Sequence, residues 1–268
     1  MRICLKDDMS ELLNVVGEEG DFLTDETGKL LTVPRGIAHT YGILHCTTNV
    51  LLVSPHSAGD DIRVYLQKRS CKKRLFPRAW TVSCGGHMGI SIDPVKSAVR
   101  EAKEELGLQI DPSRLAAIHS NDIRLRNTLK VWRFGGKPYA QFGSLTECIG
   151  KGCPEKAVLG FIEGTPLDEF PGPGAPRALE LEAFNREFCF YYAYCPSEEE
   201  LEQAMDQKTD GEAAEVKGGK ARKLKEVSLQ EFLDTERPDR TDSSDLLITH
   251  RSELERAVRD ALKSRTPS

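Results

Sequence analysis

The chain has 268 residues, 39% of them hydrophobic and 29% charged, and a net charge of −5. This composition is typical of a soluble globular protein, and the length suits one large domain or one domain with additions. The negative charge and the lack of a long basic stripe argue against nucleic-acid binding, and no apolar run is long enough to span a bilayer.

The eight cysteines are scattered, and no two of them form a Cys-x-x-Cys pair, so a zinc site built from cysteines is not expected. Acidic residues occur within the first few positions of the sequence, so this segment does not resemble a secretory leader. Free thiols without a leader indicate a reducing, cytoplasmic compartment.

Short apolar runs punctuated by turn residues open the chain. Residues 11–33 read as a hairpin, and residues 47–53 and 62–69 read as two strands of a second hairpin. Lys68 and Arg69 end the last of these strands, where they could contact phosphate groups.

Residues 84–108 begin with Cys84-Gly85-Gly86-His87 and continue as a helix with clear ends. Asp93 is placed to cap the helix, Pro94 suits its first position, and Gly107 suits a left-handed stop.

Three carboxylates share one side of this helix, because Glu101, Glu104 and Glu105 stand at i, i+3 and i+4. Like charges on one side of a helix repel one another. The cluster is therefore either a solvated acidic face of the helix or a site where a divalent cation sits among the carboxylates. Mg²⁺ prefers carboxylate and water ligands and also bridges phosphate oxygens. Arg100 can pair with Glu104 one turn on.

Beyond this helix the pattern weakens. Residues 119–183 are predicted to be an insertion with extra strands near 131–134 and 157–162. Residues 185–194 read as a strong strand, 197–205 as a helix, 206–225 as a polar loop, and 226–232 as a closing strand that enters a short helix. A C-terminal helix is predicted over 241–264.

Gly86 followed by Arg100-Glu101-Ala102-Lys103-Glu104-Glu105-Leu106-Gly107-Leu108 resembles the Nudix box. His39, His45, Gly85-Gly86-His87 and the approach through Pro77 and Trp80 are similar to the branch related to isopentenyl-diphosphate isomerase. The resemblance implies an α/β fold, the Nudix α/β/α sandwich with a mixed sheet, in a single domain (core about 35–118 and 184–235).

The resemblance also implies a function, the metal-dependent hydrolysis of a diphosphate linked to another moiety. Glu101, Glu104, Glu105 and the carbonyl of Gly86 would then hold Mg²⁺ or Mn²⁺, and the glutamates would be catalytic. Arg100 and Gly86 would be structural, and Lys68, Arg69 and His87 would bind substrate. In isomerases of the branch, histidines matching His39, His45 and His87 help to hold a metal.

Two departures keep alternatives open. Ile92 stands where the box has its first glutamate, which favours a weakly active or non-catalytic domain that binds a nucleotide or diphosphate. Cys84 lies three residues before His87, whereas the isomerase cysteine lies two before, and a slip of one residue turns a strand side chain to the other face. Isomerase activity is therefore the second alternative. The expected partner is a small-molecule diphosphate; the sequence specifies neither the attached group nor the oligomeric state.

Overall fold

The structure is a computed structural model that describes residues 10–17, 20–41, 43–55, 61–69, 79–118, 125–128, 133–134, 137–138, 186–206, 215–217, 220–222, 224–234 and 242–265. The chain divides into two compact units. The first comprises residues Met1–Cys46, His87–Ile92 and Arg126–Phe188, and the second comprises Thr47–Gly86, Asp93–Leu125 and Cys189–Ser268. Each unit is described by itself, over its described residues.

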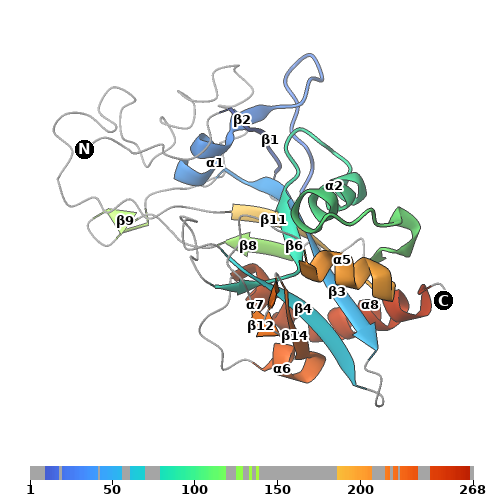
Figure 1. The fold of residues 1–268 in the computed structure, drawn as a ribbon. Helices are drawn as coiled ribbons and strands as arrows, with labels where there is room; N and C mark the ends of the chain where they lie inside the picture. The colour runs from blue at the N-terminus through green and yellow to red at the C-terminus, as the bar shows by residue number, and fades with distance from the viewer. Residues whose placement is uncertain are drawn as a thin grey trace. The chain divides into compact units, whose positions relative to one another are not determined.

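The first unit contains the predicted N-terminal hairpin. Strand β1 (Leu12–Asn14) pairs antiparallel with β2 (Thr32–Pro34), and helix α1 (Arg35–Tyr41) follows β2 directly (Figure 1). The N–H of Asn14 donates to the carbonyl of Gly89, at 3.0 Å between N and O, and the Asn14 amide donates to Ser91. These bonds fasten the segment after His87 to β1.

Most of the second unit is built on a sheet of eight strands. The main path runs β14 (Leu224–Ser228), β4 (Ile62–Lys68), β3 (His45–Pro55), β11 (Arg186–Tyr194) and β7 (Ala116–Ala117). Off this path, β5 (Trp80–Thr81) pairs with β4, β6 (Cys84–His87) with β3, and β8 (Leu125–Thr128) with β11. Strands β3 and β4 pair antiparallel, with Leu52 opposite Tyr65, which confirms the second predicted hairpin.

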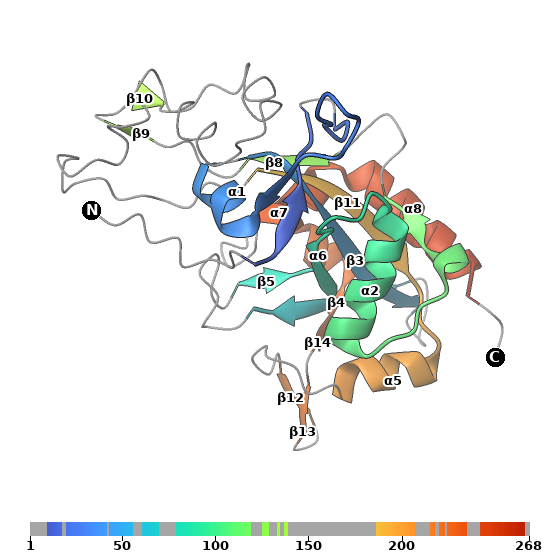
Figure 2. The same ribbon diagram turned by 90° about the horizontal axis from the view of Figure 1, so that it is seen from above.

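Helices cover both faces of this sheet (Figure 2). Helices α2 (Pro94–Leu106) and α5 (Glu198–Asp206) share one core with Leu52 and Tyr65. Helices α6 (Leu229–Leu233), α7 (Asp242–Thr249) and α8 (Arg251–Lys263) share the other core with Leu51 and Val64. Neighbouring residues of one strand therefore enter different cores, as the pleat of a sheet requires. The predicted α/β/α architecture is confirmed.

Two local predictions are wrong. The C-terminal helix is divided in two at His250, whose backbone (φ −107°, ψ 45°) leaves the helical region between α7 and α8. Residues 206–225, predicted as a loop, contain a hairpin of β12 (Glu215–Lys217) and β13 (Lys220–Arg222), with Glu215 opposite Arg222. The Gly218-Gly219 pair between the two strands is a common sequence signal for such a turn.

Of the predicted insertion, the structure describes the whole of β8 and two further strands, β9 (Arg133–Phe134) and β10 (Lys137–Pro138), which pair with each other. The strand predicted near 157–162 lies outside the described residues, and of 131–134 only the second half is described. Among the described helices, none is both long and apolar enough to cross a bilayer.

Candidate functional site

Helix α2 has the predicted ends. The Asp93 carboxylate accepts from the N–H groups of Val95 and Lys96 at 3.0 and 3.1 Å, and Pro94 occupies the first turn. Gly107 ends the helix with φ 67°, a left-handed conformation that glycine adopts without strain. Because the Asp93 carboxylate is engaged at the helix start, it is poorly placed to replace the glutamate that Ile92 displaces.

The three glutamates of α2 differ in their surroundings. Glu101 is buried, and Arg100 donates to it with 2.7 Å between Nη2 and Oε1. Glu104 is exposed over 61% of its side chain, and its Oε2 lies 3.9 Å from Nε of Arg100. The predicted pairing of Arg100 with Glu104 is present, but the shorter contact is with Glu101. Arg100 therefore joins two of the three carboxylates.

The glycines before α2 allow the backbone to approach these carboxylates closely. A Cβ on Gly86 would lie 2.6 Å from Oε2 of Glu101, so only glycine leaves room for the buried carboxylate. Glu105 accepts from the N–H of Gly85 at 3.2 Å and from Nε2 of Gln67 at 3.4 Å. Gln67 was not predicted as a site residue. Gln67 lies on the face of β4 that packs toward α2, and the alternation of side chains along that strand could have marked it as a polar position on this face.

Burial changes the proton affinity of two groups beside the glutamates. Burial raises the pKa of Glu101, and the bond and charge of Arg100 oppose the rise. Burial also raises the pKa of the Cys84 thiol well above its usual value, and the charges of Glu105 and Glu101 add to the effect. Cys84 is 1% exposed and packs in the core under α2. It is thus a buried neutral thiol.

The two predicted phosphate-binding residues, Lys68 and Arg69, stand at the end of β4 and directly after it. Lys68 stands opposite Trp80 in the ladder, and its Nζ lies 5.6 Å from the centroid of the Trp80 ring. Because successive residues alternate in a strand, Lys68 points to the face opposite Gln67. The N–H of Arg69 donates to the carbonyl of Ala79. Phosphate contact by Lys68 and Arg69 stays a prediction.

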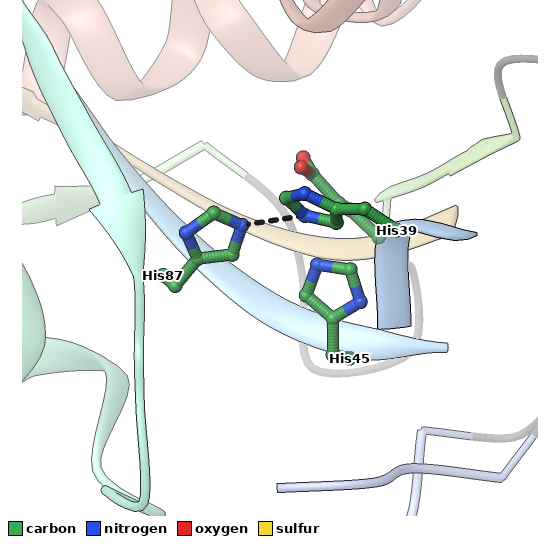
Figure 3. Close-up of side chains that lie close together, drawn as sticks. His39, His45 and His87 are labelled. Carbon is green, nitrogen blue, oxygen red and sulfur yellow. Dashed lines mark hydrogen bonds between the residues drawn. The ribbon is translucent and has the colours of Figure 1, made fainter. Parts of the chain in front are cut away.

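The first unit brings together a second group of polar side chains (Figure 3). His39 comes from α1, His45 from the start of β3, His87 from the end of β6 and Glu187 from β11, and one ligand atom of each lies within 4.8 Å of the others. Nε2 of His39 lies 3.0 Å from Nε2 of His87. Within the described ranges, no other set of three such side chains converges in this way.

His45 can offer its Nε2 atom to a metal ion. Its Nδ1 lies 2.8 Å from the carbonyl of Ile43, which can only accept, so Nδ1 carries the proton. Its Nε2 is buried without a hydrogen-bond partner. Burial, together with the charge of His39, lowers the pKa of His45 to about 4, so the ring is neutral at pH 7. A buried lone pair without a partner is costly unless a ligand takes it.

This donor set fits a divalent transition metal. Neutral imidazoles and one carboxylate are ligands of zinc, manganese, iron and cobalt, and imidazole is a poorer ligand for magnesium. Sequence reasoning named the three histidines and missed Glu187. A signal was present, since Glu187 is the acidic residue at the start of a strand that is apolar or aromatic after it.

Comparisons with known proteins agree with this geometry. Residues 46–133 match the family model described as NUDIX domain. An isopentenyl-diphosphate Delta-isomerase of Cutibacterium acnes is 31% identical over 96 residues, which are 36% of this chain and 46% of the relative. An uncharacterized Nudix hydrolase of Rhodococcus erythropolis is 31% identical over 85 residues, 31% of this chain and 44% of that protein. The matches thus span less than half of either relative.

Among solved structures, DR0079 of Deinococcus radiodurans is similar with a TM-score of 0.41 and 15% identity, over 88% of this chain and 97% of that one. This score is low, and the assignment does not rest on it. The family match contains the glycine pair, α2 and its three glutamates. These matches support a Nudix domain over residues 46–133 of the chain.

Proposed function

We propose that the protein is a divalent-metal-dependent hydrolase of a diphosphate that is linked to another moiety, such as a nucleoside, a coenzyme or an isoprenoid. The observation that carries this proposal is the arrangement on α2, where Glu101 lies against Gly86, Glu105 accepts from the N–H of Gly85, and Arg100 joins Glu104 to Glu101. A module that only binds its ligand has no need for three crowded carboxylates.

Each residue of this arrangement has a proposed role. Glu101, Glu104 and Glu105, with the carbonyl of Gly86, would hold Mg²⁺ or Mn²⁺, which neutralises a diphosphate and lowers the pKa of a bound water. Glu101 is the candidate to accept the water's proton, because burial raises its pKa toward the range of a useful base. Arg100 would keep the Glu101 carboxylate in place.

The histidine group would hold a second, transition metal, and His87 also stays a candidate for substrate contact. The proposal for this metal is supported by four convergent ligand atoms and by the partnerless Nε2 of His45. The similarity to an isomerase and this same group favour isomerase activity as a second candidate function. The burial of Cys84 weighs against it, because a thiol in the core cannot reach an alkene substrate.

The first experiment is hydrolysis of a panel of diphosphate compounds with Mg²⁺ or Mn²⁺, measured as phosphate or nucleotide release. Glu101→Gln, Glu104→Gln and Glu105→Gln should each lower turnover by about a hundredfold or more, because each removes a charge from the metal-binding face. Glu199→Gln, at an exposed position of α5, is the matched control and should keep full turnover.

Other outcomes would redirect the proposal. Thermal stabilisation by a diphosphate without turnover would favour the binding module, with Ile92 as the reason for lost catalysis. Isomerisation of isopentenyl diphosphate by the unaltered protein would replace hydrolysis by the second candidate.

A further inference from the structure

Two lysines share one tryptophan ring in the second unit. Nζ of Lys68 lies 5.6 Å from the centroid of the Trp80 ring, and Nζ of Lys225 lies 5.4 Å from the same centroid. Both distances are within the range of a cation–π interaction, in which an aromatic ring attracts an ammonium group. The two ammonium groups are therefore no further apart than the sum of these distances, although their like charges repel each other.

The pairing of three strands brings these side chains together. Lys68 is the last residue of β4 and stands opposite Trp80 of β5, while Lys225 of β14 stands opposite Leu66 of β4. Because Leu66 and Lys68 are two residues apart, they point to the same face of β4. Leu66 belongs to the core that α6, α7 and α8 share, and Trp80 packs against that core. Both lysines and the ring are only partly buried, so they form the rim of this core.

This cluster carries more positive charge than its neighbours neutralise. Among the described residues, the ammonium group of Lys68 contacts the Trp80 ring and no carboxylate. Lys225 reaches the carboxylate of Glu231, but the ion pair is long, with 3.9 Å between Nζ and Oε1. Two ammonium groups against one carboxylate leave a local positive charge in a chain whose net charge is −5. An anion bound between them would relieve their repulsion.

We propose that Lys68, Lys225 and Trp80 form a binding site for a phosphate or diphosphate anion. Lysine ammonium groups bind phosphate as point charges, and two of them can hold the oxygens of one anion. The Trp80 ring keeps both ammonium groups close to each other. The site lies on the face of β4 opposite that of Gln67, whose amide donates to Glu105. The inference therefore goes beyond the proposed hydrolysis at the α2 carboxylates.

The test is the fluorescence of Trp80 during titration with inorganic pyrophosphate. The chain has two tryptophans, so a Trp132→Phe background leaves Trp80 as the single reporter. A chelator is present throughout, which keeps metal-dependent binding at the α2 glutamates out of the measurement. We expect a saturable change in emission and weaker binding as salt is added. In a parallel titration with inorganic phosphate, weaker binding than that of pyrophosphate indicates the diphosphate of a substrate as the ligand, and equal binding indicates free phosphate.

Charge-removing variants assign the binding to the two lysines. Lys68→Met and Lys225→Met remove the charge but keep an unbranched stem over the ring. Each should raise the dissociation constant for pyrophosphate about tenfold or more, which is the usual loss for one charge-assisted contact. Lys263→Met removes an exposed lysine at the end of α8 and is the matched control. It should bind pyrophosphate as the background protein does.

Two results would overturn the proposal. If the lysines only shield the ring from water, pyrophosphate gives no saturable change in Trp80 emission, and isothermal titration calorimetry in the same chelator buffer detects no binding. If Lys68→Met and Lys225→Met bind pyrophosphate as tightly as Lys263→Met does, the anion is held elsewhere. Neither result depends on turnover, so failure of the proposed hydrolysis leaves this test intact.

Discussion

Two adjacent glycines before α2 meet very different neighbours. A Cβ at Gly85 would lie 2.7 Å from the backbone oxygen of Thr48 and 2.5 Å from Oδ1 of Asn49, whereas at Gly86 the nearest atoms all belong to the Glu101 carboxylate. A backbone atom in a sheet yields less than the end of a side chain. We expect Gly85→Ala to lower the free energy of unfolding by about 1–3 kcal/mol.

Gly86→Ala should cost less stability and more function, because it displaces the carboxylate of Glu101 from its bond with Arg100. Urea unfolding and the hydrolysis assay, run on both variants, check the contrast. Equal losses of stability in the two variants would contradict it.

Among individual residues, the sequence indicated those whose spacing along the chain forms a recognisable local pattern. Glu101, Glu104 and Glu105 stand at helical spacing, which predicts that they share one side of α2, and their proposed role comes from the resemblance to the Nudix box. For Gln67 and Glu187 the strand pattern marks a polar position, but it does not indicate which distant groups the side chain meets. Gln67 meets Glu105 38 positions later, and nothing in the local pattern of β4 specifies that helix.

Strand β11 carries two tyrosines that should make stability depend on alkaline pH. Burial raises the pKa of Tyr192 to about 12, and burial together with the charge of Glu200 raises the pKa of Tyr194 to about 12. Each hydroxyl keeps its proton in the folded state while the unfolded chain loses it near pH 10. Their contribution to stability is therefore complete below pH 10 and is lost as the pH rises toward 12.

We expect the free energy of unfolding to fall by roughly 1–3 kcal/mol between pH 9 and pH 11. Urea titrations at the two pH values measure the fall, and absorbance of tyrosinate follows the ionisation directly. The Tyr192→Phe variant is the control, because it removes one of the two groups and should reduce the slope. A slope unchanged in that variant would assign the fall to other groups.

Elements with strong end signals were predicted well and those without them were not. Helix α2 follows from Asp93, Pro94 and Gly107. The break between α7 and α8 has no such signal, because neither glycine nor proline stands near His250. The division there comes from the packing of two helix faces, with Leu247 buried before it and Leu254 after it.

For the molecule as a whole, a metal in the histidine site should act as a stabilising ligand. An ion that binds only the folded state at a hundred times its dissociation constant adds about 2.7 kcal/mol. We expect the melting temperature to fall after dialysis against a chelator and to recover with Co²⁺ or Mn²⁺. His45→Ala and Glu187→Gln should abolish the recovery, whereas Glu104→Gln should retain it because its carboxylate belongs to the other proposed site.

Differential scanning calorimetry of the full chain measures these shifts. Recovery in His45→Ala equal to that of the unaltered protein would place the stabilising ion elsewhere. The layered fold was predictable through the resemblance to the Nudix box, whereas hydrophobic alternation indicated only individual strands and helices. The histidine group was predictable only through resemblance, since its members come from four elements spread from α1 to β11.

The contact between Gly86 and Glu101 also has an evolutionary consequence. The nearest atoms to a side chain at position 86 are all from one carboxylate, at 2.6–3.0 Å. A lineage that gained alanine at 86 would have to shorten or remove the acid at 101 in the same step or soon after. The two positions are therefore expected to covary, so that descendants with a larger residue at 86 also lack the glutamate at 101.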